Sequence, residues 1–176
     1  MDFNDTPEEA KFRSEAREWL TANARQRDTS NAKASVSNKS EAERLVRAKQ
    51  WQALKAEAGY AAITWPTEYG GRGGTSIQSV IYSQEEANFD VPRGFFEIGL
   101  GMCIPTMMKW ATPEQNERYV KPALFGEEVW CQLFSEPAAG SDVAGLRTKC
   151  ERDGDDWIIN GQKVWTSGAH FCDYGI

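Results

Sequence analysis

The sequence predicts an α+β protein in which a helical domain, residues 1–127, precedes a smaller, incomplete antiparallel β-domain, residues 128–176. Capping signals and helical periodicity fill the first part. After Glu127 the pattern changes to short runs of β-branched and aromatic residues between glycine turns. Helices and strands that are segregated along a chain are typical of this class. Three or four short strands leave an open edge and face, so we expect the sequence to be part of a longer protein.

The first helix is predicted to begin after Thr6. Thr6-Pro7-Glu8-Glu9 combines a capping box with proline at the first helical position. The apolar face of this helix is expected to hold Phe12, Ala16, Trp19 and Leu20. A polar stretch, residues 23–39, has few large apolar side chains and is expected to be a mobile or exposed connection.

The second helix is expected to open with the capping box of Ser40 and Glu43 and to end near Gly59. Its apolar stripe is expected to contain Leu45, Ala48, Leu54 and Ala58.

One proline and four glycines make residues 65–74 an irregular connection that is neither regular helix nor strand. Helical spacing resumes with Ile77, Val80, Ile81 and Gln84 and stops before Pro92. Residues 95–110 are apolar nearly throughout and predict a buried helix. A last helix is expected to begin after Thr112 and to end at Gly126.

The β-domain is expected to contain strands at residues 129–134, 147–152 and 157–159. Asp153-Gly154 predicts a turn, and Asn160-Gly161 predicts a two-residue hairpin after which residues 162–165 pair back. Residues 174–176 resemble the start of another strand.

Composition excludes several classes of function. The net charge of −6 argues against a nucleic acid as the main partner. No apolar run reaches the ~20 residues that span a bilayer, and the acidic N-terminus lacks the features of a signal peptide, so we expect a cytoplasmic protein. Four widely spaced cysteines and a single histidine, His170, predict reduced thiols and no metal site.

Two neighbouring runs carry the strongest chemical signal. Residues 131–142 read Cys-Gln-Leu-Phe-Ser-Glu-Pro-Ala-Ala-Gly-Ser-Asp, and residues 161–168 read Gly-Gln-Lys-Val-Trp-Thr-Ser-Gly. Small residues let a ligand approach the backbone, whose free N–H groups can hold phosphate oxygens. An indole beside hydroxyl groups offers a flat, polar-edged ring a stacking surface and hydrogen bonds. Together the runs predict a flavin dinucleotide site.

These runs resemble the signature of the acyl-CoA dehydrogenases, Thr/Ser-Glu-Pro-Gly-Ala-Gly-Ser-Asp followed by Gly-x-Lys-x-Trp. Residues 65–73 and 112–119 also resemble blocks of that family, in the expected order. The resemblance implies a helical N-terminal domain, a β-domain and a C-terminal helical bundle that this sequence lacks. Ala138 stands where the family has glycine, and at a positive φ it would cost about 1 kcal/mol or more.

By this resemblance the cofactor is FAD. Trp165 would pack on the isoalloxazine, Thr166 and Ser167 would bond its edge, and Ser141 would also contact the CoA portion of the substrate. The residues implied to bind the cofactor are Gln132, Phe134, Ser135, Gly140, Ser141, Trp165, Thr166 and Ser167.

The implied reaction is α,β-dehydrogenation of an acyl-CoA thioester with hydride transfer to flavin N5. The family's carboxylate base lies in the C-terminal bundle, so no catalytic residue is expected in this sequence, which is expected to be inactive alone. An external acceptor such as an electron-transfer flavoprotein, and a homo- or hetero-oligomer, are further implied. The alternatives are an acyl-CoA oxidase or flavin monooxygenase on the same scaffold, and a non-catalytic partner subunit.

Other candidate residues have plainer interpretations. Glu136 and Asp142 could form an acid/base pair, but we favour an ion pair for the first and local turn bonds for the second. His170 is expected to be a packing or surface residue. An acyl tunnel and ordinary core packing explain one further set equally well, namely Phe95, Phe96, Met102, Met107 and Met108.

Overall fold

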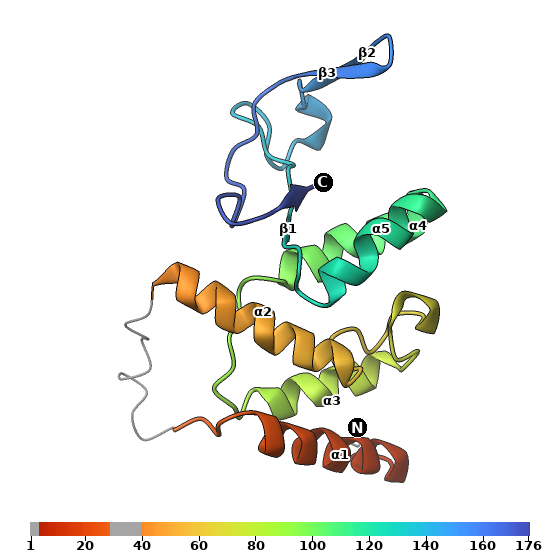
Figure 1. Ribbon diagram of the computed structural model, residues 1–176, viewed down its shortest axis with the longest axis vertical. Coiled ribbons are helices and arrows are strands. Elements are labelled where there is room, and N and C mark those ends of the chain that lie inside the picture. Colours follow the sequence, from red (N-terminus) through yellow and green to blue (C-terminus); the bar gives the residue numbers. More distant parts are fainter. Residues whose placement is uncertain (1–3, 29–39) are drawn as a thin grey trace.

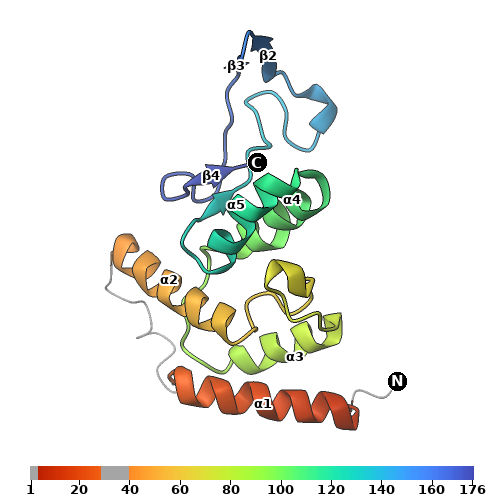
Figure 2. The ribbon, with the colours of Figure 1, turned by 45° about the vertical axis from the view of Figure 1, so that its right-hand side comes forward.

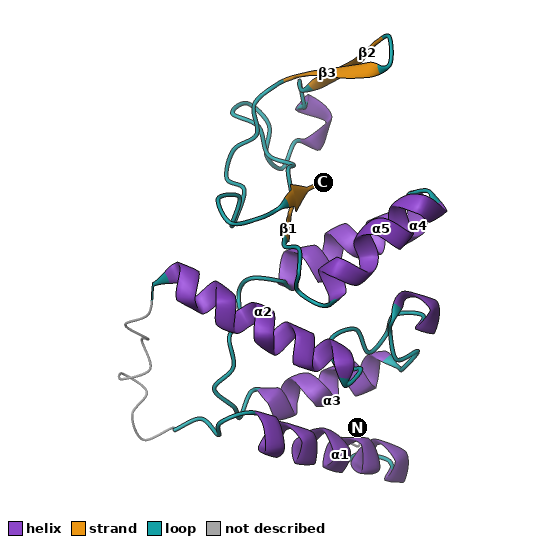
Figure 3. Cartoon of the chain, viewed as in Figure 1, coloured by secondary structure: helices purple, strands orange, loops and turns teal. Residues whose placement is uncertain are grey.

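The computed structural model describes residues 4–28 and 40–176, and it confirms the predicted α+β class. The helices form the lower part of the molecule in Figure 1, and the short strands lie at its upper end. Figure 3 shows how little of that upper end is strand and how much is loop. The helices are α1 Pro7–Asn23, α2 Glu41–Glu57, α3 Ser76–Glu86, α4 Ile104–Trp110 and α5 Pro113–Leu124. The strands are β1 Trp130–Cys131, β2 Lys149–Asp153, β3 Asp156–Asn160 and β4 Tyr174–Gly175.

The predicted helix starts are confirmed by their capping boxes. The side chains of Thr6, Ser40 and Thr112 each accept a hydrogen bond from the backbone N–H three residues on. The side-chain oxygen of that later residue accepts a bond from the backbone N–H of the capping residue. Thr75 caps α3 in the same way. Each box satisfies two backbone donors that the helix itself leaves unpaired, so these starts are determined locally.

The lower core joins α1 to α3, which lie side by side in Figures 1 and 2. The predicted face of α1 is confirmed by the burial of Phe12, Ala16 and Leu20. Tyr60 stacks on Tyr82 of α3 with ring centroids 4.8 Å apart. Aromatic pairs of this kind stabilise the fold by more than the burial of their surface area alone.

The apolar stripe predicted for α2 is wrong at Leu54, which is exposed. The helix predicted from the spacing of Ile77 and Val80 is confirmed as α3, although both side chains are exposed. The faces that are buried instead contain polar side chains. The Gln52 amide of α2 donates to the Leu124 carbonyl at 2.8 Å. Burial of a polar group costs little when it is hydrogen-bonded, so hydrophobicity alone selected the wrong face.

The buried face of α3 also contains a polar residue, Glu85, whose carboxylate bonds to two arginines of α1. Arg17 Nε lies 2.8 Å and Arg13 Nη1 lies 3.1 Å from its carboxylate. These hydrogen bonds, first from Arg17 and then from Arg13, lower the pKa of Glu85.

The helix predicted at residues 95–110 is only partly buried, which corrects that prediction. A π-helical segment, Gly99–Cys103, leads directly into α4. Ile104 and Met107 lie in the upper core, whereas Met102 and Trp110 are exposed. An apolar composition therefore did not mean burial on all sides.

The β-region contains one antiparallel and one parallel pairing. Strands β2 and β3 form the antiparallel hairpin around the turn predicted at Asp153-Gly154. The predicted strand at residues 129–134 shortens to β1, which pairs in parallel with β4, Trp130 opposite Tyr174. The Asn160-Gly161 hairpin is wrong, because β3 ends there and the chain runs on without a strand. Gly161 instead allows a close approach, since a Cβ on it would overlap the Thr148 side chain.

The polar connection after α1 is described as far as residue 28. There Asp90 N donates to the Arg25 carbonyl and Arg27 N to the Asn88 carbonyl, both at 2.8 Å. The rest of that predicted connection, residues 29–39, lies outside the described residues. Across residues 4–28 and 40–176, no helix has the length and apolarity that crossing a membrane requires.

Candidate functional site

The centre of the candidate site is the carboxylate of Glu136, which is 7% exposed. It accepts hydrogen bonds from Arg147 N at 2.6 Å, Thr148 N at 3.0 Å and Lys163 Nζ at 2.8 Å. The bond from Lys163, followed by those from Thr148 and Arg147, lowers the pKa of Glu136 to about 2. The predicted ion pair of Glu136 is confirmed. A carboxylate held in this way stays ionised and is a poor general base at neutral pH.

The same contacts join the two sequence runs. Val164 N donates to the Ser135 carbonyl at 2.9 Å, and Lys163 Nζ donates to the Phe134 carbonyl at 3.1 Å. Residues 134–136 therefore lie beside residues 163–164, although 27 positions separate Glu136 from Lys163 in sequence. The loop and the Trp165 segment form one surface.

The loop after Glu136 closes on itself. Glu136 N donates to the Ala139 carbonyl at 2.7 Å, and Ala139 N donates back at 3.1 Å. Ala138 has no positive φ, so alanine carries no backbone penalty at this position. For Asp142 the structure records a main-chain bond, from Gly145 N to its carbonyl at 3.1 Å, rather than a side-chain cap.

Trp165 is unusual in both conformation and exposure. Its φ is 59°, and it is the one non-glycine residue with positive φ in the described ranges. The left-handed region costs a residue with a Cβ about 1–2 kcal/mol. The side chain is 90% exposed, so burial of the indole does not offset that cost. Strain of this kind gathers at functional sites.

The other predicted site residues lie around this surface at different depths. Gln132, Ser135 and Thr166 are half-buried, whereas Ser167 is exposed beside Trp165. Phe134 is also exposed. Gly140 and Ser141 are exposed, and within the described chain no hydrogen bond joins them to residues 165–168. An open indole, an open phenyl ring and nearby hydroxyls fit a flat, polar-edged ring system such as a flavin.

The segment that follows Trp165 is anchored on the helical part. His170 Nε2 lies 2.6 Å from a carboxylate oxygen of Glu41 at the start of α2, which agrees with its predicted surface role. The ring of Phe171 contacts the ring of Phe95, with centroids 5.2 Å apart. Sequence reasoning missed this contact, because 76 positions separate the two rings and neither belongs to a motif.

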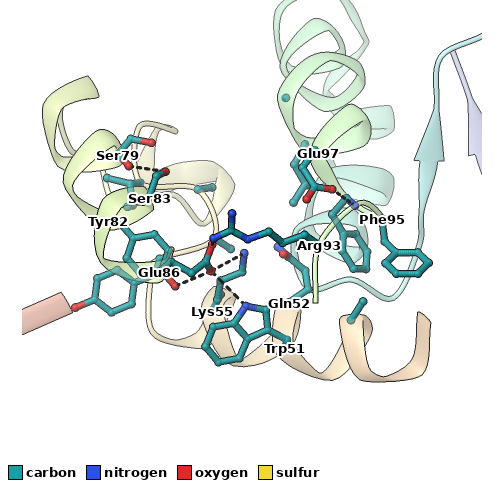
Figure 4. A pocket seen from close by; sticks show the side chains of 18 of the residues that line it. Trp51, Gln52, Lys55, Ser79, Tyr82, Ser83, Glu86, Arg93, Phe95 and Glu97 are labelled. Carbon is teal, nitrogen blue, oxygen red and sulfur yellow. Dashed lines mark hydrogen bonds and ion pairs between the residues drawn. The ribbon is translucent and has the colours of Figure 1, made fainter. Parts of the chain in front are cut away.

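Phe95 also lines a cavity of about 450 Å³ in the helical part. The cavity lies between α2, α3 and residues 92–101, and Figure 4 shows its side chains. Phe96 lines it as well, whereas Met107 belongs to the upper core and Met102 is exposed. Of the five side chains, Phe95 and Phe96 therefore line the cavity, Met107 and Met108 belong to the core, and Met102 belongs to neither.

The polar residues of this cavity were also missed by sequence reasoning. Glu86 of α3 accepts from Trp51 Nε1 at 3.3 Å and from the Tyr82 hydroxyl at 3.2 Å. Lys55 Nζ and Arg93 Nη2 lie 3.5 and 3.6 Å from its two oxygens. In Figure 4, Arg93 extends across the cavity toward Glu86. No sequence signal distinguished them, because charged and polar residues occur throughout α2 and α3.

Comparison with known families covers nearly the whole chain. The model of the acyl-CoA dehydrogenase N-terminal domain matches residues 6–127. The model of the acyl-CoA dehydrogenase middle domain matches residues 131–176.

Individual relatives agree with this. The acyl-CoA dehydrogenase IpdE1 of Mycobacterium tuberculosis is 37% identical over 93% of the chain and 42% of its own length. The ChsE4-ChsE5 complex of M. tuberculosis aligns with a TM-score of 0.74 at 31% identity, over 99% of the chain and 42% of the solved one. The Tcur3481-Tcur3483 steroid ACAD aligns at 0.71 with 28% identity, over 99% and 44%. The chain thus spans about two-fifths of the length of these relatives.

Proposed function

The chain belongs to the acyl-CoA dehydrogenase family, and on this premise we propose that the whole protein is an FAD-dependent dehydrogenase of acyl-CoA thioesters. The reaction would remove an α-proton and a β-hydride and leave an α,β-enoyl thioester. The observation that carries the proposal is the joined surface of the two runs, in which Lys163 pairs with Glu136, Val164 bonds to Ser135 and the next residue, Trp165, is exposed.

In this proposal each side chain has a positioning task. The Trp165 ring would stack on the isoalloxazine, and Thr166 and Ser167 would hydrogen-bond its edge. Gln132, Phe134 and Ser135 would line the flavin from the first run. Gly140 and Ser141 would lie at the cofactor loop, with Ser141 also near the CoA portion of the substrate. When bound, the flavin supplies the hydride acceptor, which the side chains of this chain cannot provide.

The proton must go to a base that this surface does not offer. Glu136 is fully engaged by three donors and its pKa is lowered, so it does not take up a proton at neutral pH. We therefore expect the carboxylate base to come from a part of the whole protein that lies outside residues 1–176.

Anaerobic mixing of the full-length protein with a panel of straight, branched and steroid-like acyl-CoA thioesters tests the function. Bleaching of the flavin absorbance by one thioester supports dehydrogenation and begins to define the acyl group. Bound flavin that no thioester bleaches would favour a monooxygenase or a non-catalytic subunit. Rapid reoxidation of the reduced flavin in air would favour an oxidase over a dehydrogenase that uses an external acceptor.

We also propose that the full-length protein assembles as an oligomer. One relative, the ChsE4-ChsE5 complex, contains two different proteins. Light scattering of the protein alone, and after co-expression with any family member encoded beside it, tests whether the assembly is homomeric or heteromeric.

A further inference from the structure

The cavity between α2, α3 and residues 92–101 has a polar centre that the proposed reaction does not use. At about 450 Å³, it has the size of a small-molecule pocket. Phe95 lines it and contacts Phe171, which follows the Trp165 segment by only a few residues. The Phe95–Phe171 contact thus links the wall of the cavity to the segment that follows Trp165.

The polar centre holds two cations and one carboxylate. Lys55 and Glu86 are largely buried, with side-chain exposures of 19% and 13%. Glu86 already accepts from Trp51 and Tyr82, so much of its acceptor capacity is used. Burial, followed by the charge of Glu86, raises the pKa of Tyr82 above its usual range, which keeps its hydroxyl protonated. The formal charges of Lys55, Arg93 and Glu86 add up to +1.

The donors of the two cations are not satisfied by Glu86. The distances of 3.5 Å from Lys55 and 3.6 Å from Arg93 are those of ion pairs rather than direct hydrogen bonds. An ammonium has three N–H donors and a guanidinium has five. Cationic donors in a partly closed pocket attract an oxygen that accepts hydrogen bonds.

The second carboxylate of the cavity does not provide this acceptor. Glu97 bonds with one oxygen to Gly94 N at 2.8 Å and with the other to Phe96 N at 3.1 Å. It therefore serves the backbone where the following helix begins, and it leaves Lys55 and Arg93 free for a ligand.

We propose that this cavity receives the far end of the acyl group, and that Lys55 and Arg93 select an acyl group whose far end carries an acceptor oxygen, a ketone or a carboxylate. This rests on the proposed function and adds a specificity to it. The apolar wall of Phe95 and Phe96 would hold the carbon skeleton, and the cations would hold the terminal oxygen. A methyl-ended chain of the same length would leave the donors of the largely buried Lys55 without a partner.

The test is calorimetric titration of the full-length, flavin-loaded protein with non-oxidisable CoA thioethers. The three ligands have equal length and end in a methyl group, a ketone or a carboxylate. Comparison of the last two shows whether the cavity prefers a ketone oxygen or a carboxylate oxygen. We expect at least one oxygen-ended ligand to bind tenfold or more tightly than the methyl-ended one. Lys55→Met and Arg93→Met are expected to reduce that ratio to about two or less, with little change for the methyl-ended ligand.

Lys49→Met is the matched control, because Lys49 lies on the same helix but contacts Glu127 and Asp173 outside the cavity. It should retain the full preference. Arg93 is about half-exposed, so its replacement leaves a folded protein even if Lys55→Met does not. Equal affinity of the wild type for all three ligands, or an unchanged preference in Arg93→Met, would overturn the proposal while leaving the dehydrogenase assignment intact. Failure of every CoA ligand to bind would overturn both.

Discussion

Replacing Trp165 by glycine and, separately, by alanine measures the backbone strain at the centre of the candidate flavin surface. The indole is 90% exposed, so folding buries only about a tenth of its surface. With ~250 Å² for a large aromatic side chain and ~25 cal/mol per Å², this burial contributes about 0.6 kcal/mol. Both variants lose that contribution equally.

The two variants differ in the left-handed conformation. At φ 59° alanine retains a cost of about 1–2 kcal/mol, which glycine avoids. The greater freedom of glycine in the unfolded chain opposes this by about 0.5–1 kcal/mol. We therefore expect Trp165→Gly to be more stable than Trp165→Ala by about 0.5–1 kcal/mol. In ordinary backbone the order is the reverse.

Unfolding of the flavin-free, full-length variants in guanidinium measures which of the two is more stable. When both unfold with the same denaturant slope, the variant with the higher midpoint is the more stable one. FAD titration of the same proteins should show both affinities reduced by about fivefold to tenfold, since stacking is worth about 1 kcal/mol. An alanine variant as stable as the glycine variant would refute the strain. Unchanged FAD affinity in both would refute the stacking role.

Four further substitutions test the Glu136 anchor and the packing of the helical part. Because the pKa of Glu136 is lowered to about 2 from 4.5, its stabilisation is complete above pH 4.5 and is lost as the pH falls toward 2. Glu136→Gln should bind FAD more weakly at pH 7 and lack this acid dependence, whereas identical pH profiles of FAD release would contradict its anchoring role. Gly126→Ala, at φ 75° with its Cβ 2.9 Å from a side-chain carbon of α2, should lose about 2–4 kcal/mol of unfolding free energy. Gly94→Ala, at φ 91° with open space around it, should lose only about 1 kcal/mol, and equal losses would exclude the steric contribution. Glu85→Gln should cost about 1–2 kcal/mol at neutral pH, less than a fully buried pair because one of its arginines is exposed. Because the pKa of Glu85 is lowered in the folded state, the difference from wild type should vanish in acid, and a difference that persists there would point to packing.

Much of the helical part could be predicted because its signals are local. The capping boxes after Thr6, Ser40 and Thr112 join residues three positions apart, so the sequence contains both partners. The buried faces were less predictable. Leu54 and Val80 are exposed while Gln52 and Glu85 are buried, because the partners of those polar groups come from other helices.

The candidate site divides in the same way. The residue types of the two runs indicated a flavin surface, but the sequence did not show that Lys163 pairs with Glu136 beside the Ser135–Val164 bond. It also predicted a hairpin at Gly161, where the structure uses the glycine to let Thr148 come close. A glycine permits both a turn and a close approach, and its neighbours in space determine which one occurs.

By itself the sequence determined the α+β class, the helix starts and the presence of two runs that are typical of a flavin site, since each depends on residues a few positions apart. Only the tertiary structure decided the parallel pairing of β1 with β4, the left-handed Trp165 and the cluster of Lys55, Glu86 and Arg93. Lys55 and Glu86 come from different helices, and their charges interact only because the packing of α2 and α3 brings them within 4 Å in a partly dry pocket.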